Sequence, residues 1–203
     1  ISFVEKKDDD SHTNLGFSSE DGSLYTRPLN EAGDKLSLNY ERFTLEWVGK
    51  AATRHFRLDG STHAQILAWI KQMVTDAGID KPYIYKFHYD LPYQVTDDFT
   101  FKLLDAGRLQ ELLHLRILAQ MVLESFLQDH KLDSEIRIWP HHFDTGAYAS
   151  LNDNSGPAIG LGLAIPDSDH EDHYFYIAAY KGHDGVDISA FDGLTNGTWH
   201  NNG

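Results

Sequence analysis

The chain has 203 residues, a formal net charge of −14 and no cysteine. A chain of this length suits a single domain whose hydrophobic core is stable without cross-links. The absence of cysteine excludes disulfides, thiolate nucleophiles and thiolate zinc sites. The negative charge argues against nucleic acid and anionic membrane surfaces as partners. The sequence has no apolar run near the roughly 20 residues that cross a bilayer.

Strand pairs are predicted in the first part of the chain. Asp21 and Gly22 form a strong hairpin-turn signal between two short runs, and Gly49 and Lys50 mark a second turn between two longer ones. Side chains alternate between the faces of a strand, so apolar residues at every second position predict a sheet with one buried face. The predicted strands cover residues 12–17, 23–27, 35–48 and 52–58.

The hydrophobic period then changes to that of a helix. Thr62 and Gln65 have the spacing of a capping box, and Gly78 stands where a left-handed helix cap belongs. With apolar residues at helical intervals, these signals predict an amphipathic helix over about 61–77. A second helix is predicted over about 98–130. Its apolar residues lie on most sides, which predicts a central, buried helix.

Four further strands are predicted from alternation and aromatic content. They cover residues 82–90, 135–151, 157–165 and 173–181. Because strand pairs stand at both ends of the chain with the helices between them, we expect an α+β fold: a mainly antiparallel sheet with both helices packed on one face. We expect one domain over 1–203, with loosely packed ends at 1–11 and 182–203, in the cytoplasm.

The stretch IRIWPHHFDTGAYASL holds the most suggestive polar side chains. If it is one continuous strand, His142 and Asp144 point to one face, while Trp139 and His141 point to the other. The adjacent histidines then cannot readily bind one ion, but His142 and Asp144 could do so with a third ligand such as His173. The alternative, which we favour, is that the imidazoles are hydrogen-bonded within the fold, because His and Asp at this spacing are common without metal.

Aromatic side chains alternate along two of the predicted strands. Tyr83, Tyr85, Phe87 and Tyr89 do so in 82–90, and Tyr174, Tyr176 and Tyr180 share one face of the last strand, 173–181. Aligned aromatic rings can stack a sugar or another flat ligand, and tyrosine hydroxyls can orient it. The alternative is that one side of the strand packs under a helix and the hydroxyls only reach its rim.

Several catalytic motifs are missing. The sequence has no G-x-S-x-G nucleophile elbow and no Walker loop, and the Gly160-Leu-Gly162 run neither has a third glycine nor opens a helix. Serine acyl transfer, P-loop phosphoryl transfer and dinucleotide redox chemistry therefore lose support. Acid–base chemistry by His142 with Asp144 remains allowed. The sequence does not identify a cofactor.

One stretch resembles a known family. WPHHFD, from Trp139 to Asp144, follows a long predicted helix and has the form W-x-x-x-F-D. In this, and in the order of strand pair, amphipathic helix, long helix and late aromatic strand, the chain resembles an uncharacterised bacterial family, a domain of unknown function, over most of residues 12–181. The resemblance implies the same fold and directs attention to WPHHFD, and it implies no catalytic role.

Three functional hypotheses follow. The first is a domain that binds a small ligand or a protein partner through a pocket near WPHHFD. The second is a metal-assisted or acid–base enzyme that uses His142 and Asp144, with His173 as a further metal ligand. The third is an interaction protein that works through a sheet edge near Pro140, because proline in a strand implies an edge or a bulge. The candidate ligand-binding residues are Trp139, His141, His142, Asp144, Tyr174 and Tyr176.

Overall fold

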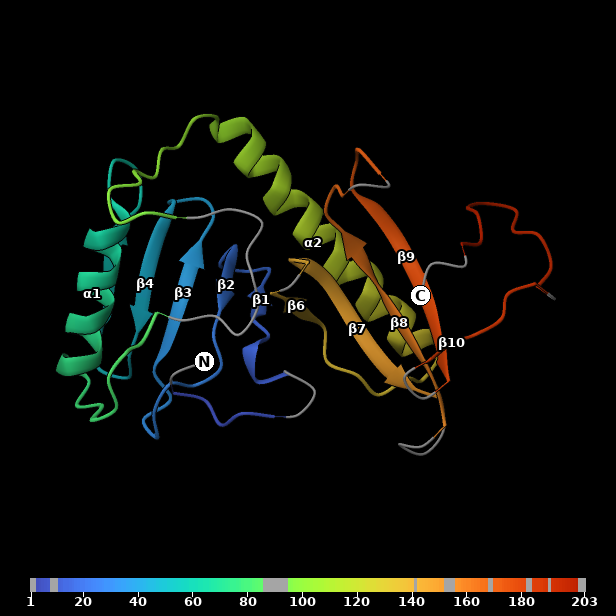
Figure 1. Ribbon diagram of the computed structural model, residues 1–203, viewed down its shortest axis with the longest axis horizontal. Helices are drawn as coiled ribbons and strands as arrows, with labels where there is room; N and C mark the ends of the chain where they lie inside the picture. The colour runs from blue at the N-terminus through green and yellow to red at the C-terminus, as the bar shows by residue number, and fades with distance from the viewer. Residues whose placement is uncertain are drawn as a thin grey trace. The chain divides into compact units, whose positions relative to one another are not determined.

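The computed structural model describes residues 3–7, 11–85, 95–140, 142–151, 156–167, 170–181, 184–189 and 191–200. These residues form two α-helices and two antiparallel sheets (Figure 1). The predicted α+β class is therefore confirmed. The strands form two sheets where one was expected, and each sheet has one helix packed against it. The chain divides into two compact units, 1–117 and 118–203. The single-domain organisation and the loosely packed ends stay predictions.

The first unit contains a sheet of five antiparallel strands in chain order, preceded by a 3-10 turn at Ser11–Thr13. Its strands are β1 (Gly16–Ser18), β2 (Ser23–Tyr25), β3 (Lys35–Asn39), β4 (Thr44–Val48) and β5 (Thr53–Arg57). Cross-strand pairing aligns Leu24, Leu38 and Leu45 in one row that ends at Phe56. The alternate positions are mostly polar, so this sheet has one apolar and one polar face.

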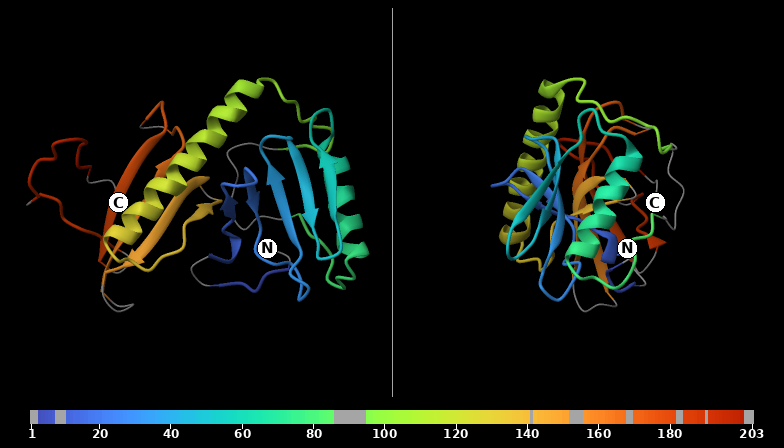
Figure 2. Two further views of the ribbon diagram at one scale, coloured as in Figure 1. Left: turned by 180° about the vertical axis from the view of Figure 1, so that it is seen from behind. Right: turned by 90° about the vertical axis from the view of Figure 1, so that its left-hand side faces the viewer.

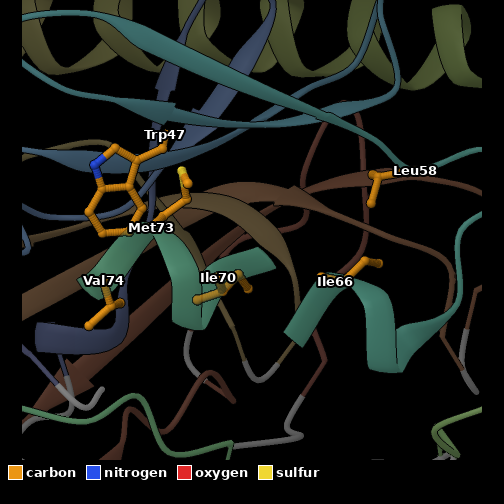
Figure 3. Packing of buried hydrophobic residues seen from close by; sticks show 6 residues of the cluster. All are labelled: Trp47, Leu58, Ile66, Ile70, Met73 and Val74. Atoms are coloured by element: carbon orange, nitrogen blue, oxygen red, sulfur yellow. The ribbon is translucent and has the colours of Figure 1, made fainter. Parts of the chain in front are cut away.

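Helix α1 (His63–Asp76) covers the apolar face of this sheet (Figure 3). The predicted capping box is present, since the Gln65 N–H donates to Thr62 Oγ1 and the Thr62 N–H donates to Gln65 Oε1. Gly78 follows the helix with φ 66°, the left-handed conformation that commonly ends helices. The buried core between helix and sheet consists of Trp47, Leu58, Ile66, Ile70, Met73 and Val74.

The segment 35–48, predicted as one strand, is a hairpin. β3 ends at Asn39, β4 begins at Thr44, and these two residues are cross-strand partners. The four-residue loop between them ends at Phe43, which has φ 49°. A bulky residue rarely adopts this left-handed conformation. The loop contains neither Gly nor Asn, the residues that normally mark such a turn in a sequence.

The strand predicted over 82–90 is not observed where it can be described. Residues 82–85 are not in a strand, and 86–90 lie outside the described residues. Tyr83 instead stacks on Phe3, with 6.2 Å between the ring centroids, beside the core under α1.

No helix within the described ranges has both the length and the apolar character of a membrane span.

The second unit contains a sheet in the order β10-β9-β8-β7-β6. Its strands are β6 (Arg137–Trp139), β7 (Asp144–Ser150), β8 (Pro157–Ala164), β9 (Tyr174–Lys181) and β10 (Asp184–Gly185). The C-terminal part of helix α2 (Ala106–Asp129) runs along one face of this sheet (Figures 1 and 2). The core that they share consists of Leu123, Leu127, Ala147, Ala149 and Leu161.

Helix α2 differs from its prediction in length and in burial. It begins after Asp105, not near residue 98, and Asp105 accepts hydrogen bonds from two N–H groups of the first turn, as an N-cap side chain does. The expected burial on all sides holds for the side that faces the sheet. On other sides three apolar side chains are exposed: Leu118, Met121 and Val122.

Replacing Thr62 by Ala should lower the free energy of unfolding by about 1 kcal/mol, because the α1 capping box loses its hydroxyl acceptor. Thr75, an exposed threonine within the same helix, provides the control. Thr75→Ala should be neutral or slightly stabilising, since alanine is the better helix former. Urea unfolding followed by circular dichroism measures both, and an equal loss in the two variants would contradict the capping role.

Candidate functional site

WPHHFD forms the turn of a hairpin rather than part of a continuous strand. β6 ends at Trp139, β7 begins at Asp144, and these residues are cross-strand partners. The loop closes with a 2.6 Å hydrogen bond from the Phe143 N–H to the Trp139 carbonyl, and Phe143 has φ 57°. His142 is exposed in this loop, and His141 lies outside the described residues.

The hairpin corrects the predicted strand parity. Directly opposed residues of an antiparallel pair share a face, so Trp139 and Asp144 lie on the same face, where a continuous strand would have separated them. Ile138 and Thr145 oppose each other on the other face, and both are fully buried. His142 belongs to the loop, so the expectation that it shares a strand face with Asp144 does not hold.

Asp144 is bound by a tyrosine from two strands away. The Tyr176 hydroxyl, on β9, donates to Asp144 Oδ2 at 2.5 Å, and Asp144 is only 7% exposed. The tyrosine crosses β8 at Gly162, which is a cross-strand partner of both Tyr176 and Gly146. A Cβ at Gly162 would stand 2.7 Å from the Tyr176 hydroxyl. Glycine is therefore required here for the tyrosine to reach Asp144.

The pKa of Tyr176 is raised far above its ordinary value of 10.0. Burial is the main cause, and the charge of Asp144 and its hydrogen bond with the phenol add to it. The phenol is therefore a neutral hydrogen-bond donor at physiological pH. It is unsuited to act as a base or a nucleophile, because both roles need a phenolate.

A second tyrosine pair lies on the same face. The rings of Tyr148, on β7, and Tyr180, on β9, have centroids 5.7 Å apart. Gly160, on β8, is the cross-strand partner of Tyr148, and a Cβ at this glycine would stand 3.1 Å from the Tyr180 ring. Tyr148 is 48% exposed, and within the described residues neither hydroxyl has a hydrogen-bond partner. The pair thus presents accessible aromatic surface and two polar groups.

Tyr174 shares the face but is bound to the acidic loop that precedes β9. Its hydroxyl donates to Asp167 Oδ2 at 2.6 Å, and its ring lies 4.3 Å from that of His170. The His170 N–H donates to Asp167 Oδ1. These contacts hold the two ends of the loop together, so Tyr174 has a partner distinct from that of Tyr176.

The candidate metal ligands do not form a metal site. Across the described ranges, no three His, Asp or Glu side chains are placed to hold an ion. His142, Asp144 and His173 all belong to those ranges and are not such a group. Asp144 instead uses Oδ2 to accept the Tyr176 hydroxyl.

We call the surface opposite α2 the tyrosine face. It includes two residues that the sequence singled out by their position, Trp139 and Asp144, and three tyrosines of the last long strand. The glycines of β7 and β8 and Tyr148 were missed. Gly160 and Gly162 stand two apart in a predicted strand, which is a readable signal for a same-face glycine pair. The tyrosine face consists of Trp139, Asp144, Tyr148, Tyr174, Tyr176 and Tyr180, with Gly146, Gly160 and Gly162 beneath them.

Comparisons with protein-family models, with curated proteins and with solved structures find no match for this chain. The resemblance carried by WPHHFD therefore stays a prediction. The function has to be inferred from the chemistry of the tyrosine face itself.

Replacing Tyr176 by Phe should lower the free energy of unfolding by about 1–3 kcal/mol, because the buried Asp144 loses its donor. Tyr174→Phe is the matched control, since it removes a hydroxyl bonded to the exposed Asp167 and should cost at most about 1 kcal/mol. Urea unfolding near neutral pH measures both. Equal losses of unfolding free energy in the two variants would show that the buried Tyr176–Asp144 bond stabilises the fold no more than the exposed Tyr174–Asp167 bond.

The Tyr176→Phe variant also tests the pKa shift. Because the pKa of Tyr176 is raised in the folded state, its stabilising contribution is fully present below the unfolded value of 10.0 and is lost as the pH rises above it. The difference in unfolding free energy between wild type and variant should therefore shrink from about pH 8 to about pH 11. A difference that stays constant over this range would contradict the shift.

Replacing Gly162 by Ala should cost about 1–3 kcal/mol, because the added Cβ would meet the Thr145 carbonyl at 2.6 Å as well as the Tyr176 hydroxyl. Gly193→Ala is the control, since a Cβ there meets nothing within 4 Å. It should change the unfolding free energy by no more than about 0.5 kcal/mol. Thermal and urea unfolding measure both variants, and a neutral Gly162→Ala would refute the crossing geometry.

Proposed function

We propose that this chain is a non-catalytic binding domain whose tyrosine face, next to the WPHHFD hairpin, holds a small flat ligand such as a sugar ring. Aromatic rings on one rigid sheet face supply stacking area, and tyrosine hydroxyls supply orienting hydrogen bonds. The sheet below keeps the rings in place, because the glycines allow close contact between ring and backbone.

The observation that carries this proposal is the accessible Tyr148–Tyr180 pair. A tyrosine that served only the core would bury its ring and pair its hydroxyl. Tyr148 instead is half exposed beside a second ring, and the two hydroxyls have no partners in the part of the chain that is described. A surface with exposed rings and unpaired polar groups is typical of a ligand-binding face.

The Tyr176–Asp144 bond supports binding over catalysis. It engages one of the two oxygens of a buried carboxylate, and the phenol stays protonated. The alternative, an enzyme that uses His142 and Asp144, has less support because His142 is exposed in the loop and Asp144 is buried under Tyr176. We therefore assign Asp144 and Tyr176 the task of fixing the face.

The expected ligand is neutral or cationic. A formal net charge of −14 repels polyanions, so nucleic acid remains an unfavourable partner. A chain without cysteine suits a reducing compartment, so we place this binding in the cytoplasm. A protein partner at the same face is the second form of the proposal, and it would be expected to insert a flat side chain against Tyr148.

Saturation-transfer NMR with a panel of methyl glycosides and neutral nucleosides tests the proposal. At least one compound should bind, and Tyr148→Ala should weaken its binding by up to about tenfold, since stacking on an aromatic ring contributes about 0.5–1.5 kcal/mol. Phe175→Ala is the matched control. Phe175 is also 48% exposed but lies on the opposite face of the same sheet, beside Leu163.

The control variant should bind like the wild type. If no compound of the panel binds or raises the melting temperature, the small-ligand form of the proposal fails. If Phe175→Ala weakens binding as much as Tyr148→Ala, the tyrosine face is not the site.

A further inference from the structure

The first sheet has an edge strand that is more open than the rest of that sheet. β5 (Thr53–Arg57) is the last strand in the order β1-β2-β3-β4-β5, so only one of its sides is paired. Four of its five residues are exposed, and Phe56 is partly buried against Trp69 of α1. The strand has no proline and pairs with β4 without a bulge. It therefore lacks two of the devices that normally protect a sheet edge.

The register of β4 and β5 shows which backbone groups face outward. The Gly49 N–H donates to the Ala52 carbonyl, and the Leu58 N–H donates to the Phe43 carbonyl. Hydrogen-bonded positions alternate along an antiparallel pair, so the even-numbered residues from 52 to 58 bond to β4. Thr53, His55 and Arg57 direct their N–H and C=O groups away from the sheet.

One of these outward groups is already occupied, since the Ser61 hydroxyl donates to the Arg57 carbonyl at 2.7 Å. Within the described residues, no strand pairs with the outer side of β5. Two residues, Thr53 and His55, thus keep both backbone groups available, and Arg57 keeps its N–H. This row matches the ladder that one added strand of about five residues would form.

Two of the five β5 side chains, Arg54 and Arg57, are cations in a strongly acidic chain, and His55 is charged only when protonated. Arg54 points to the α1 side, and His55 and Arg57 point to the polar face. The Arg57 guanidinium pairs with the Asp59 carboxylate, with 2.7 Å between Nη2 and Oδ2. His55 Nδ1 lies 3.2 Å from Glu46 Oε1. Arg54 has no carboxylate partner in the described parts of the chain. The β5 edge thus offers one cation without a carboxylate among the described residues, Arg54 on the α1 side, while Arg57 and His55 on the polar face already lie beside carboxylates of this chain, whose net charge is −14.

We propose that the outer edge of β5 accepts an extended acidic segment of a partner protein as a sixth strand of the first sheet. Main-chain hydrogen bonds to Thr53, His55 and Arg57 would hold the segment. Its acidic side chains would lie opposite Arg54, His55 and Arg57, and an apolar side chain would lie opposite Phe56. A second copy of this chain fits less well, because two β5 edges would bring like charges together.

The pattern defines a probe. Antiparallel to β5, the preferred residues read Glu-Val-Glu-Glu-Thr. A peptide of this sequence, labelled with fluorescein on its N-terminal amine and amidated at its C-terminus, is titrated into the full chain. Fluorescence polarisation should show saturable binding that weakens with added NaCl. A peptide with Gln in place of each Glu should bind about tenfold more weakly. In heteronuclear NMR, the largest amide shifts should fall on Thr53, His55 and Arg57.

Two variants and one control variant locate the contact. Arg54→Glu should weaken the binding of the acidic peptide by about tenfold, because one attractive charge pair becomes repulsive. Lys71→Glu, on the exposed side of α1, makes the same charge change elsewhere and should leave binding unchanged. His55→Pro removes an outward N–H that β4 does not use, and it should abolish binding while circular dichroism shows a folded chain.

Other outcomes would overturn the proposal. If the Gln peptide binds as tightly as the Glu peptide, charge does not select the partner. If Arg54→Glu and Lys71→Glu lower the affinity equally, the effect comes from the total charge of the chain and not from a contact at β5. Absence of binding at millimolar peptide would refute the docking strand itself. Self-association in light scattering that His55→Pro abolishes would assign the edge to a second copy of the chain.

Discussion

The hydrogen bond between Tyr176 and Asp144 is the interaction on which the tyrosine face depends. It connects β9 to β7 across the intervening strand β8. Its acceptor, Asp144, is the first residue of β7 and the last of the WPHHFD stretch. The same bond gives the buried Asp144 carboxylate a hydrogen-bond donor, because a buried carboxylate without donors would destabilise the fold. Its position explains why β8 carries glycine where the ring crosses. One side-chain contact thus connects the hairpin, the glycines and the aromatic surface.

The parts of the fold that could be predicted from sequence have local causes. The α1 capping box and the left-handed Gly78 act within a few residues of each other, so the sequence alone located both ends of that helix. The hairpins at β3–β4 and β6–β7 were not predicted for the opposite reason. Each is a four-residue loop that ends in a phenylalanine, Phe43 or Phe143, in a conformation usually reserved for Gly or Asn. Turn chemistry that depends on such a residue leaves no mark in a sequence pattern.

The site shows the same division between local and distant causes. Trp139 and Asp144 stood out in the sequence because they flank an unusual run of polar residues. The partner of Asp144 could not be read from that run, since Tyr176 is 32 positions further along the chain and reaches it across another strand. The alternation of Tyr174, Tyr176 and Tyr180 was readable, and their common face follows from the observed pairing. Contacts that depend on register between distant strands require the structure.

The glycine beneath Tyr176 has a consequence for how this chain can vary through evolution. Position 162 can accept a side chain only if position 176 gives up the ring that lies over it and the Thr145 carbonyl also moves away, and a chain that keeps the ring must keep the glycine. The two positions are therefore expected to change size together, in opposite directions. Among related chains this pair would serve as a signature: those with glycine and tyrosine share the face described above, and those that have exchanged both have built a different surface on the same sheet.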